Sequence, residues 1–198
     1  MNQNNNQYIA KVFVSCSLRA EDRKFVDLVA NILKHYQILP FGTVGLYDVS
    51  PENTAQLMKR NIEQADFVVI AATKRYLTKD NQNGNESNQL SEMIHSEAGM
   101  AFAFTKPVVV FVEEGTNPGN FLQSITQYIT LDGTQTNLDS QQNLIAYLLS
   151  NAYQISEEVK RKKVWQELGR LALGGLALFG GLKLLENYDD ECPADILT

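Results

Sequence analysis

Apolar and polar residues follow one another along this chain in blocks that predict strands alternating with helices. Apolar runs typical of buried strands occupy residues 8–14, 38–44, 67–72, 107–112 and 128–131. Apolar residues recur with helical period over residues 21–36, 54–64 and 90–104. Strands that alternate with helices form parallel crossovers, so we predict an α/β domain at residues 8–150, with five mostly parallel strands and helices on both faces of the sheet.

Loops that follow parallel strands gather at the carboxyl edge of a sheet, where such sheets bind their ligands. This prediction brings together residues 15–19, 45–53, 73–76 and 113–120. The sequence has neither GxGxxG nor GxxxxGK[ST] after any of these strands, so the usual phosphate-binding loops are absent. Residues 79–89, rich in asparagine around Gly84, predict a mobile loop.

One carboxylate interrupts the apolar stripe of the helix predicted at 90–104. At helical spacing Glu97 shares a face with Leu90, Ile94, Ala101 and Phe104. A buried carboxylate needs a hydrogen-bond partner or a raised pKa, and such groups concentrate at functional sites. The alternative is a boundary glutamate that bonds a neighbouring loop.

Composition narrows the classes of function. The chain of 198 residues is 44% hydrophobic, enough for one core and an appendage, and its net charge of −6 argues against nucleic acid as a partner. Cys16 and Cys192 form no CxxC pair and the only histidines are His35 and His95, so we expect no metal site. Residues 1–7 predict a disordered lead without the features of a secretory signal, and we expect a cytoplasmic protein.

The order of these elements and three sequence features resemble a TIR domain. The features are Val-Phe-Val-Ser in the first strand, a loop after the second strand, and a glutamate in the helix before a Pro-Val-Val-Val strand. The most specific part runs from Met93 to Glu97 and is similar to the family's Trp-x-x-x-Glu segment, with Met93 in place of the tryptophan. The resemblance covers residues 8–133 and implies a flavodoxin-like fold.

The resemblance also implies an activity. In TIR domains that are enzymes, the glutamate of this segment carries cleavage of the nicotinamide–ribose bond of NAD, which assigns that role to Glu97. NAD is then the substrate, and we expect no cofactor. We expect the other substrate contacts from residues of the predicted rim and of the same helix, namely Ser15, Ser17, Arg19, Tyr47, Thr73 and Met93. Arg19 is the candidate for the substrate phosphates.

The resemblance further implies assembly. Residues 45–53 match the family's BB loop, which gates the cleft and mediates contacts between TIR domains. We therefore expect a homo-oligomer. Similarity to bacterial TIR proteins implies a setting in antiviral defence, by NAD depletion or by a nucleotide signal, and a partner defence protein.

Two alternatives of different class stay open. The segment Glu97-Ala98-Gly99-Met100-Ala101 also resembles the Glu-x-Gly-x-Ala segment of nucleoside 2-deoxyribosyltransferases, which use the glutamate as a nucleophile on a nucleoside. The second alternative is a TIR adaptor that acts by assembly alone, since a fold does not determine activity.

The C-terminal region, residues 151–198, predicts a helical tail that is rich in leucine and glycine. Between Arg170 and Lys183 lie only uncharged residues, a stretch shorter than a bilayer core. Gly174, Ala177 and Gly181 fall on one side of such a helix, which suits close helix packing. Self-association, membrane contact through residues 165–185, and docking on the α/β domain all stay open.

Overall fold

The computed structural model describes residues 8–43, 46–47, 53–79 and 86–183, with residues 125 and 165–183 described by their backbone alone. Five strands form the main sheet: β1 (Ala10–Cys16), β2 (Ile38–Phe41), β3 (Phe67–Ala72), β6 (Val108–Glu113) and β8 (Tyr128–Leu131). Their order is β2-β1-β3-β6-β8, and all four neighbouring pairs are parallel. This is the doubly wound order of flavodoxin-like proteins, so the predicted fold class is confirmed.

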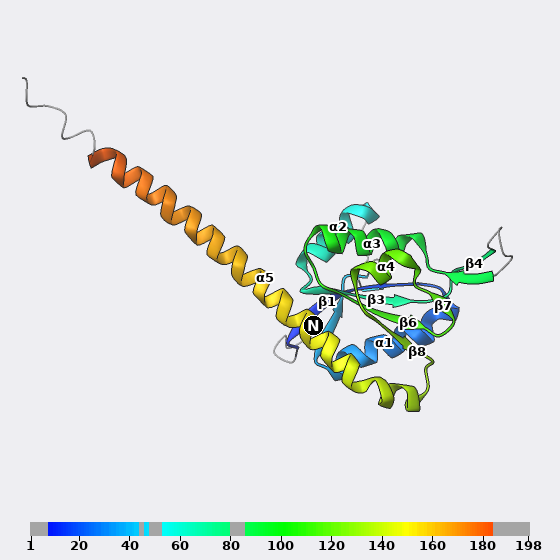
Figure 1. Cartoon of the computed structure of the whole chain (residues 1–198). Helices are drawn as coiled ribbons and strands as arrows, with labels where there is room; N and C mark the ends of the chain where they lie inside the picture. Colours follow the sequence, from blue (N-terminus) through cyan, green and yellow to red (C-terminus); the bar gives the residue numbers. More distant parts are fainter. Residues whose placement is uncertain (1–7, 44–45, 48–52, 80–85, 184–198) are drawn as a thin grey trace, which may run out of the picture. The chain divides into compact units, whose positions relative to one another are not determined.

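Helices cover both faces of the main sheet (Figure 1). They are α1 (Arg23–His35), α2 (Thr54–Gln64), α3 (Glu92–Ala103), α4 (Gly119–Ile125) and α5 (Gln135–Lys183), and a 3-10 helix, Ala20–Asp22, precedes α1. Residues of α1 and of the first part of α5 pack on one face of the sheet, and residues of α2, α3 and α4 pack on the other. Because successive strand residues point to opposite faces, Val12 and Phe13 lie in different halves of the core.

The loop prediction for residues 79–89 is wrong at both ends. β4 (Tyr76–Lys79) and β5 (Glu86–Gln89) pair antiparallel, and β7 (Thr116–Asn117) pairs with β5. Residues 80–85 lie outside the described residues. The strands escaped prediction because β4 is exposed throughout and β5 lacks apolar side chains, so backbone pairing and contacts such as Thr78 with Ser87 hold them together without a hydrophobic pattern.

The tail predicted at residues 151–198 is helical as far as Lys183, but its helix, α5, begins at Gln135, inside the residues predicted for the α/β domain. Residues 184–198 lie outside the described residues. The chain divides into two compact units, residues 1–157 and 158–198. In the first unit, α5 buries Ile145, Leu149, Ala152 and Ser156. No helix within the described residues combines the length and the apolarity that a membrane span requires. The side chains of the predicted small-residue face lie outside the described part of the chain.

Candidate functional site

A cleft of about 540 Å³ opens at the carboxyl ends of β1 and β3. β2 lies on one side of β1 in the sheet, and the next strand along the chain, β3, lies on the other side of β1. The winding direction of the sheet therefore reverses between β1 and β3. Doubly wound sheets bind ligands at such a point. The cleft is lined by Cys16, Ser17, Leu18, Arg19, Thr43, Thr54, Met58, Arg75, Ser91, Met93, Ile94 and Glu97.

Glu97 reaches the cleft from the buried face of α3. Ser91 caps the helix, its hydroxyl accepting a hydrogen bond from the backbone N–H of Met93 at 3.3 Å. One helical face then buries Ile94, Glu97, Ala98 and Ala101, as the apolar stripe predicts. Glu97 is only 7% exposed although it lines the cleft. The site therefore presents a carboxylate that is largely withdrawn from water.

Ser15 of β1 is the hydrogen-bond partner of Glu97. It lies two residues beyond Phe13 and so points to the same face of the sheet, toward α3. The Ser15 hydroxyl is fully buried and donates a hydrogen bond to Oε2 of Glu97. This bond joins the first strand to α3 and fixes the carboxylate at the floor of the cleft.

Two opposing effects set the protonation of Glu97. Burial disfavours the charged form, and the hydrogen bond from Ser15 favours it. Burial dominates and raises the pKa of Glu97 from an ordinary 4.5 to about 7. Near neutral pH, the carboxyl group is therefore divided between its protonated and ionised forms.

We expect Ser15→Ala to raise the pKa of Glu97 further, because the substitution removes a donor that stabilises the carboxylate. Carbon-13 NMR of the labelled Glu97 carboxyl group, followed through a pH titration, measures this pKa directly. Ser17→Ala is the matched control, since the Ser17 hydroxyl accepts a bond from the backbone N–H of Arg19 and makes none to Glu97. A titration midpoint that is unmoved or lowered in Ser15→Ala contradicts the assigned contact.

Cys16 also lines the cleft, but it is unsuited to nucleophilic chemistry. Burial, and then the nearby charge of Glu97, raise the pKa of the Cys16 thiol to about 12. The thiolate is the nucleophilic form, so at neutral pH the side chain stays an inert thiol. Of these two side chains, Glu97 is therefore the candidate for a reactive group.

Arg19 lies at the cleft, but its guanidinium is already engaged. Nε donates to Asp22 at 2.7 Å and one terminal nitrogen donates to the other Asp22 oxygen at 3.0 Å. Glu21 lies at 3.1 Å from the remaining nitrogen, and the backbone carbonyl of Lys74 accepts a further bond. Asp22 is buried, so this bidentate pair compensates a carboxylate that would otherwise be buried alone.

The structure gathers some of the predicted site residues and separates others. Ser17, Arg19 and Met93 line the cleft together with Glu97, and Ser15 lies beneath it. Neither the buried Thr73 nor the exposed Tyr47 is among the lining residues. The rest of the predicted gating loop at 45–53, apart from Leu46, Tyr47 and Asn53, lies outside the described residues.

Among the described lining residues of the cleft, Arg75 is the one charged residue that the sequence prediction did not single out. It belongs to the predicted rim segment 73–76, which follows β3, and it is a lining residue of the cleft. The available signal was a pair of cations, Lys74 and Arg75, shortly after the central strand. Thr73 drew the prediction instead, and its side chain is 2% exposed.

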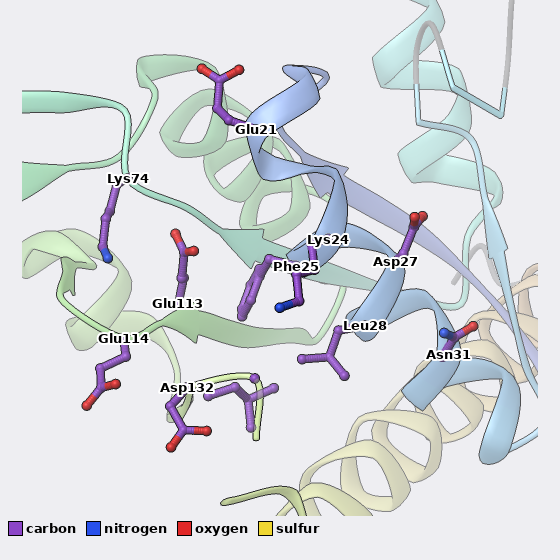
Figure 2. A pocket seen from close by; sticks show the side chains of 12 residues that line it. Glu21, Lys24, Phe25, Asp27, Leu28, Asn31, Lys74, Glu113, Glu114 and Asp132 are labelled. Carbon is purple, nitrogen blue, oxygen red and sulfur yellow. The ribbon is translucent and has the colours of Figure 1, made fainter. Parts of the chain in front are cut away.

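A second cleft, of about 510 Å³, lies at the carboxyl ends of β3, β6 and β8, beside α1 (Figure 2). Its acidic lining residues are Glu21, Asp27, Glu113, Glu114 and Asp132, against the two lysines Lys24 and Lys74. This balance repels anionic ligands such as nucleotides. Within the described residues, no group of three or more histidine, cysteine or acidic side chains is arranged to hold a metal ion.

Comparisons with known proteins add little to this geometry. No protein family profile matches the chain, and no curated protein matches it. Among solved structures, the chain is similar to the CMP N-glycosidase BcmB of Clostridium botulinum, with 16% identity and a TM-score of 0.44. That likeness covers 68% of this chain and 98% of the glycosidase. What the chain does is therefore inferred from the cleft itself.

Proposed function

We propose that this chain cleaves the bond between nicotinamide and ribose in NAD, with Glu97 as the catalytic carboxylate. The observation that carries the proposal is a glutamate, 7% exposed, that is held by Ser15 and lines a cleft at the reversal point of a parallel sheet. The sequence resemblance to TIR domains around Met93 and Glu97 supports the same assignment.

One carboxylate is sufficient for this reaction. The pyridinium nitrogen of NAD already carries a positive charge, so nicotinamide leaves as a neutral molecule when it takes the electron pair of the broken C–N bond. Departure needs no general acid, unlike that of an ordinary sugar leaving group. Glu97 is the only carboxylate among the described lining residues of the cleft.

Ionised Glu97 assists in one of two ways. It stabilises the positive charge that develops on the ribose, or it attacks the anomeric carbon to form an ester that water then cleaves. Either way, water supplies the new hydroxyl group and releases one proton, and the products are nicotinamide and ADP-ribose. Attack by a hydroxyl group of the substrate, or of a second acceptor, gives a cyclic or conjugated product instead.

The protonation of Glu97 predicts the pH dependence of the reaction. Only the ionised form assists, and the pKa of Glu97 is about 7, so kcat/KM for NAD should rise through this pH and level off above it. Below the midpoint, we expect a fall of about tenfold for each pH unit. Nicotinamide release, corrected for the reaction without protein, measures this profile. A flat profile between about pH 5 and 8 contradicts the role of Glu97.

Cleavage of an ordinary nucleoside or nucleotide is the second candidate. Its base is uncharged and departs more readily when protonated, and a carboxyl group with a pKa of about 7 holds a proton near neutral pH. In a transferase of this class, the ionised form of the glutamate acts instead, as the nucleophile, and the sugar is then passed to another base.

One incubation separates the candidates. The full-length protein is incubated with NAD, with deoxynucleosides in the presence of a second base, and with nucleoside monophosphates, and products are identified by mass. Free nicotinamide supports the NAD assignment, whereas base exchange or release of an uncharged base supports the second candidate. No product, under conditions in which the protein assembles, leaves the adaptor as the better account.

The biological setting is also a proposal. By the resemblance to bacterial TIR proteins, we place the activity in antiviral defence, where it depletes NAD or makes a nucleotide signal. Activity is then controlled by self-assembly, or by a partner defence protein that promotes it.

A further inference from the structure

Arg75 differs from Arg19 in how its charge is compensated. Arg19 faces two carboxylates, those of Asp22 and Glu21. Arg75 contacts the ring of Tyr76, with its guanidinium carbon 5.8 Å from the ring centroid. Within the described residues, no carboxylate lies at ion-pair distance from Arg75. As far as the described residues show, the Glu97 cleft therefore contains one arginine whose N–H donors are available to a ligand.

The surroundings of Arg75 also suit an anion. Besides the two arginines and Glu97, the lining residues are uncharged, and Ser17, Thr54 and Ser91 supply hydroxyl groups. The second cleft has a similar volume, but its five carboxylates outnumber its two lysines. The two clefts thus differ in charge rather than in size, and an anionic ligand favours the one that contains Arg75.

The volume of the Glu97 cleft is consistent with a ligand larger than a sugar. The cleft of about 540 Å³ lies within the usual range for small-molecule and cofactor sites. Glu97 lies at its floor and Arg75 at its exposed wall, on a different element. A ligand in contact with both presents a reacting centre to Glu97 and a negatively charged group to Arg75.

We propose that Arg75 binds the phosphate groups of the substrate and thereby positions the ribose bond against Glu97. The inference rests on the proposed function, and it names the pyrophosphate of NAD as the anion. Arg75 takes the role that the sequence suggested for Arg19, because a planar guanidinium binds phosphate oxygens bidentately when no carboxylate competes.

The test compares NAD with nicotinamide riboside, which has the same scissile bond and no phosphate. We expect Arg75→Gln to lower kcat/KM for NAD by about tenfold or more and to leave that for nicotinamide riboside unchanged. For Arg75→Lys, kcat/KM for NAD should lie between the values for Arg75→Gln and wild type, because lysine keeps the positive charge but lacks the planar pair of N–H donors. Lys74→Gln is the matched control, because it removes a neighbouring charge whose side chain lines the other cleft.

Each remaining outcome decides the question. If Arg75→Gln lowers kcat/KM equally for NAD and for nicotinamide riboside, or lowers it for neither, the phosphate role of Arg75 is overturned. If wild type cleaves neither substrate, the proposed function fails, and calorimetric binding of ADP-ribose tests Arg75 separately. Affinity that falls in Arg75→Gln but not in Lys74→Gln supports the anion site. Equal affinity of the two variants, or no binding by wild type, overturns it.

Discussion

Glu97→Gln is expected to abolish nicotinamide release from NAD, with a loss of at least about 10³-fold in kcat. The amide keeps the shape of the side chain and its contact with Ser15, but it loses the negative charge that stabilises the developing ribose cation. It also cannot serve as the attacking carboxylate. Purified protein, assayed for nicotinamide at saturating NAD, measures the effect.

Glu92→Gln is the matched control for this prediction. Glu92 lies in the first turn of the same helix, is exposed, and is not a lining residue of the cleft. Its substitution removes one charge from α3 and should leave kcat near the wild-type value. A Glu97→Gln protein that releases nicotinamide at the wild-type rate contradicts the catalytic assignment.

Glu97→Gln is expected to remove activity but to stabilise the fold relative to wild type as the pH rises. The folded state raises the pKa of Glu97 from 4.5 to about 7, so it binds a proton more tightly than the unfolded chain. The stabilising effect of this proton is complete below the unfolded pKa and is lost as the pH rises through the folded pKa. The loss is up to about 3 kcal/mol, because one pKa unit corresponds to about 1.4 kcal/mol.

Glutamine does not titrate, so the variant lacks this loss. We expect the free energy of unfolding of Glu97→Gln, relative to wild type, to increase between about pH 5 and 8. Urea unfolding of both proteins across this range measures the difference. Inactivity with retained or increased stability at pH 8 separates a catalytic carboxylate from one that only holds the fold.

The central strands of the main sheet, β1, β3 and β6, were accessible to sequence analysis because they are buried on both faces. Every residue from Phe67 to Ala72 is buried, so β3 appears in the sequence as one continuous apolar run. The small sheet gave no such signal, because the pairing of β4 with β5 depends on backbone hydrogen bonds between residues that are mostly exposed or polar. Hydrophobic periodicity reports burial, and exposed strands lack it.

Part of the candidate site could likewise be predicted from the sequence, and part of it could not. Glu97 was identifiable because a carboxylate in an apolar stripe conflicts with the local pattern of its own helix. The roles of Arg19 and Arg75 were not identifiable, because they depend on which side chains each guanidinium group contacts in the folded chain. Arg75 is available to bind a ligand because no carboxylate among the described residues pairs with it. Arg19 is less available because it pairs with Asp22, and only the fold shows that Asp22 is buried.

Removing residues 165–198 is expected to leave a folded domain that is monomeric and slow. In the part of α5 whose side chains the structure describes, the buried residues lie between Ile145 and Ser156 and so precede the cut. The free energy of unfolding should therefore stay close to that of the full-length chain. A chain that ends at Ser150 is the contrasting variant, since it also removes the buried Ala152 and Ser156 and should be less stable.

Dependence on assembly is measured by dilution. Specific activity of the full-length chain should fall over a hundred-fold dilution, because assembly weakens by mass action, whereas that of the truncated chain should be low and constant. Truncated protein that keeps the full activity and its concentration dependence shows that the tail does not supply the assembly.

Gly174→Leu distinguishes helix association from membrane contact in the tail. By helical spacing, Gly174 shares a face with Ala177 and Gly181, so a leucine there blocks close approach of a second helix while it raises apolarity. We expect the variant to lose oligomers and activity in sedimentation and NAD cleavage assays. If the full-length protein sediments with lipid vesicles, and Gly174→Leu changes neither oligomeric state nor activity, then residues 165–185 contact membrane rather than a second copy of the chain.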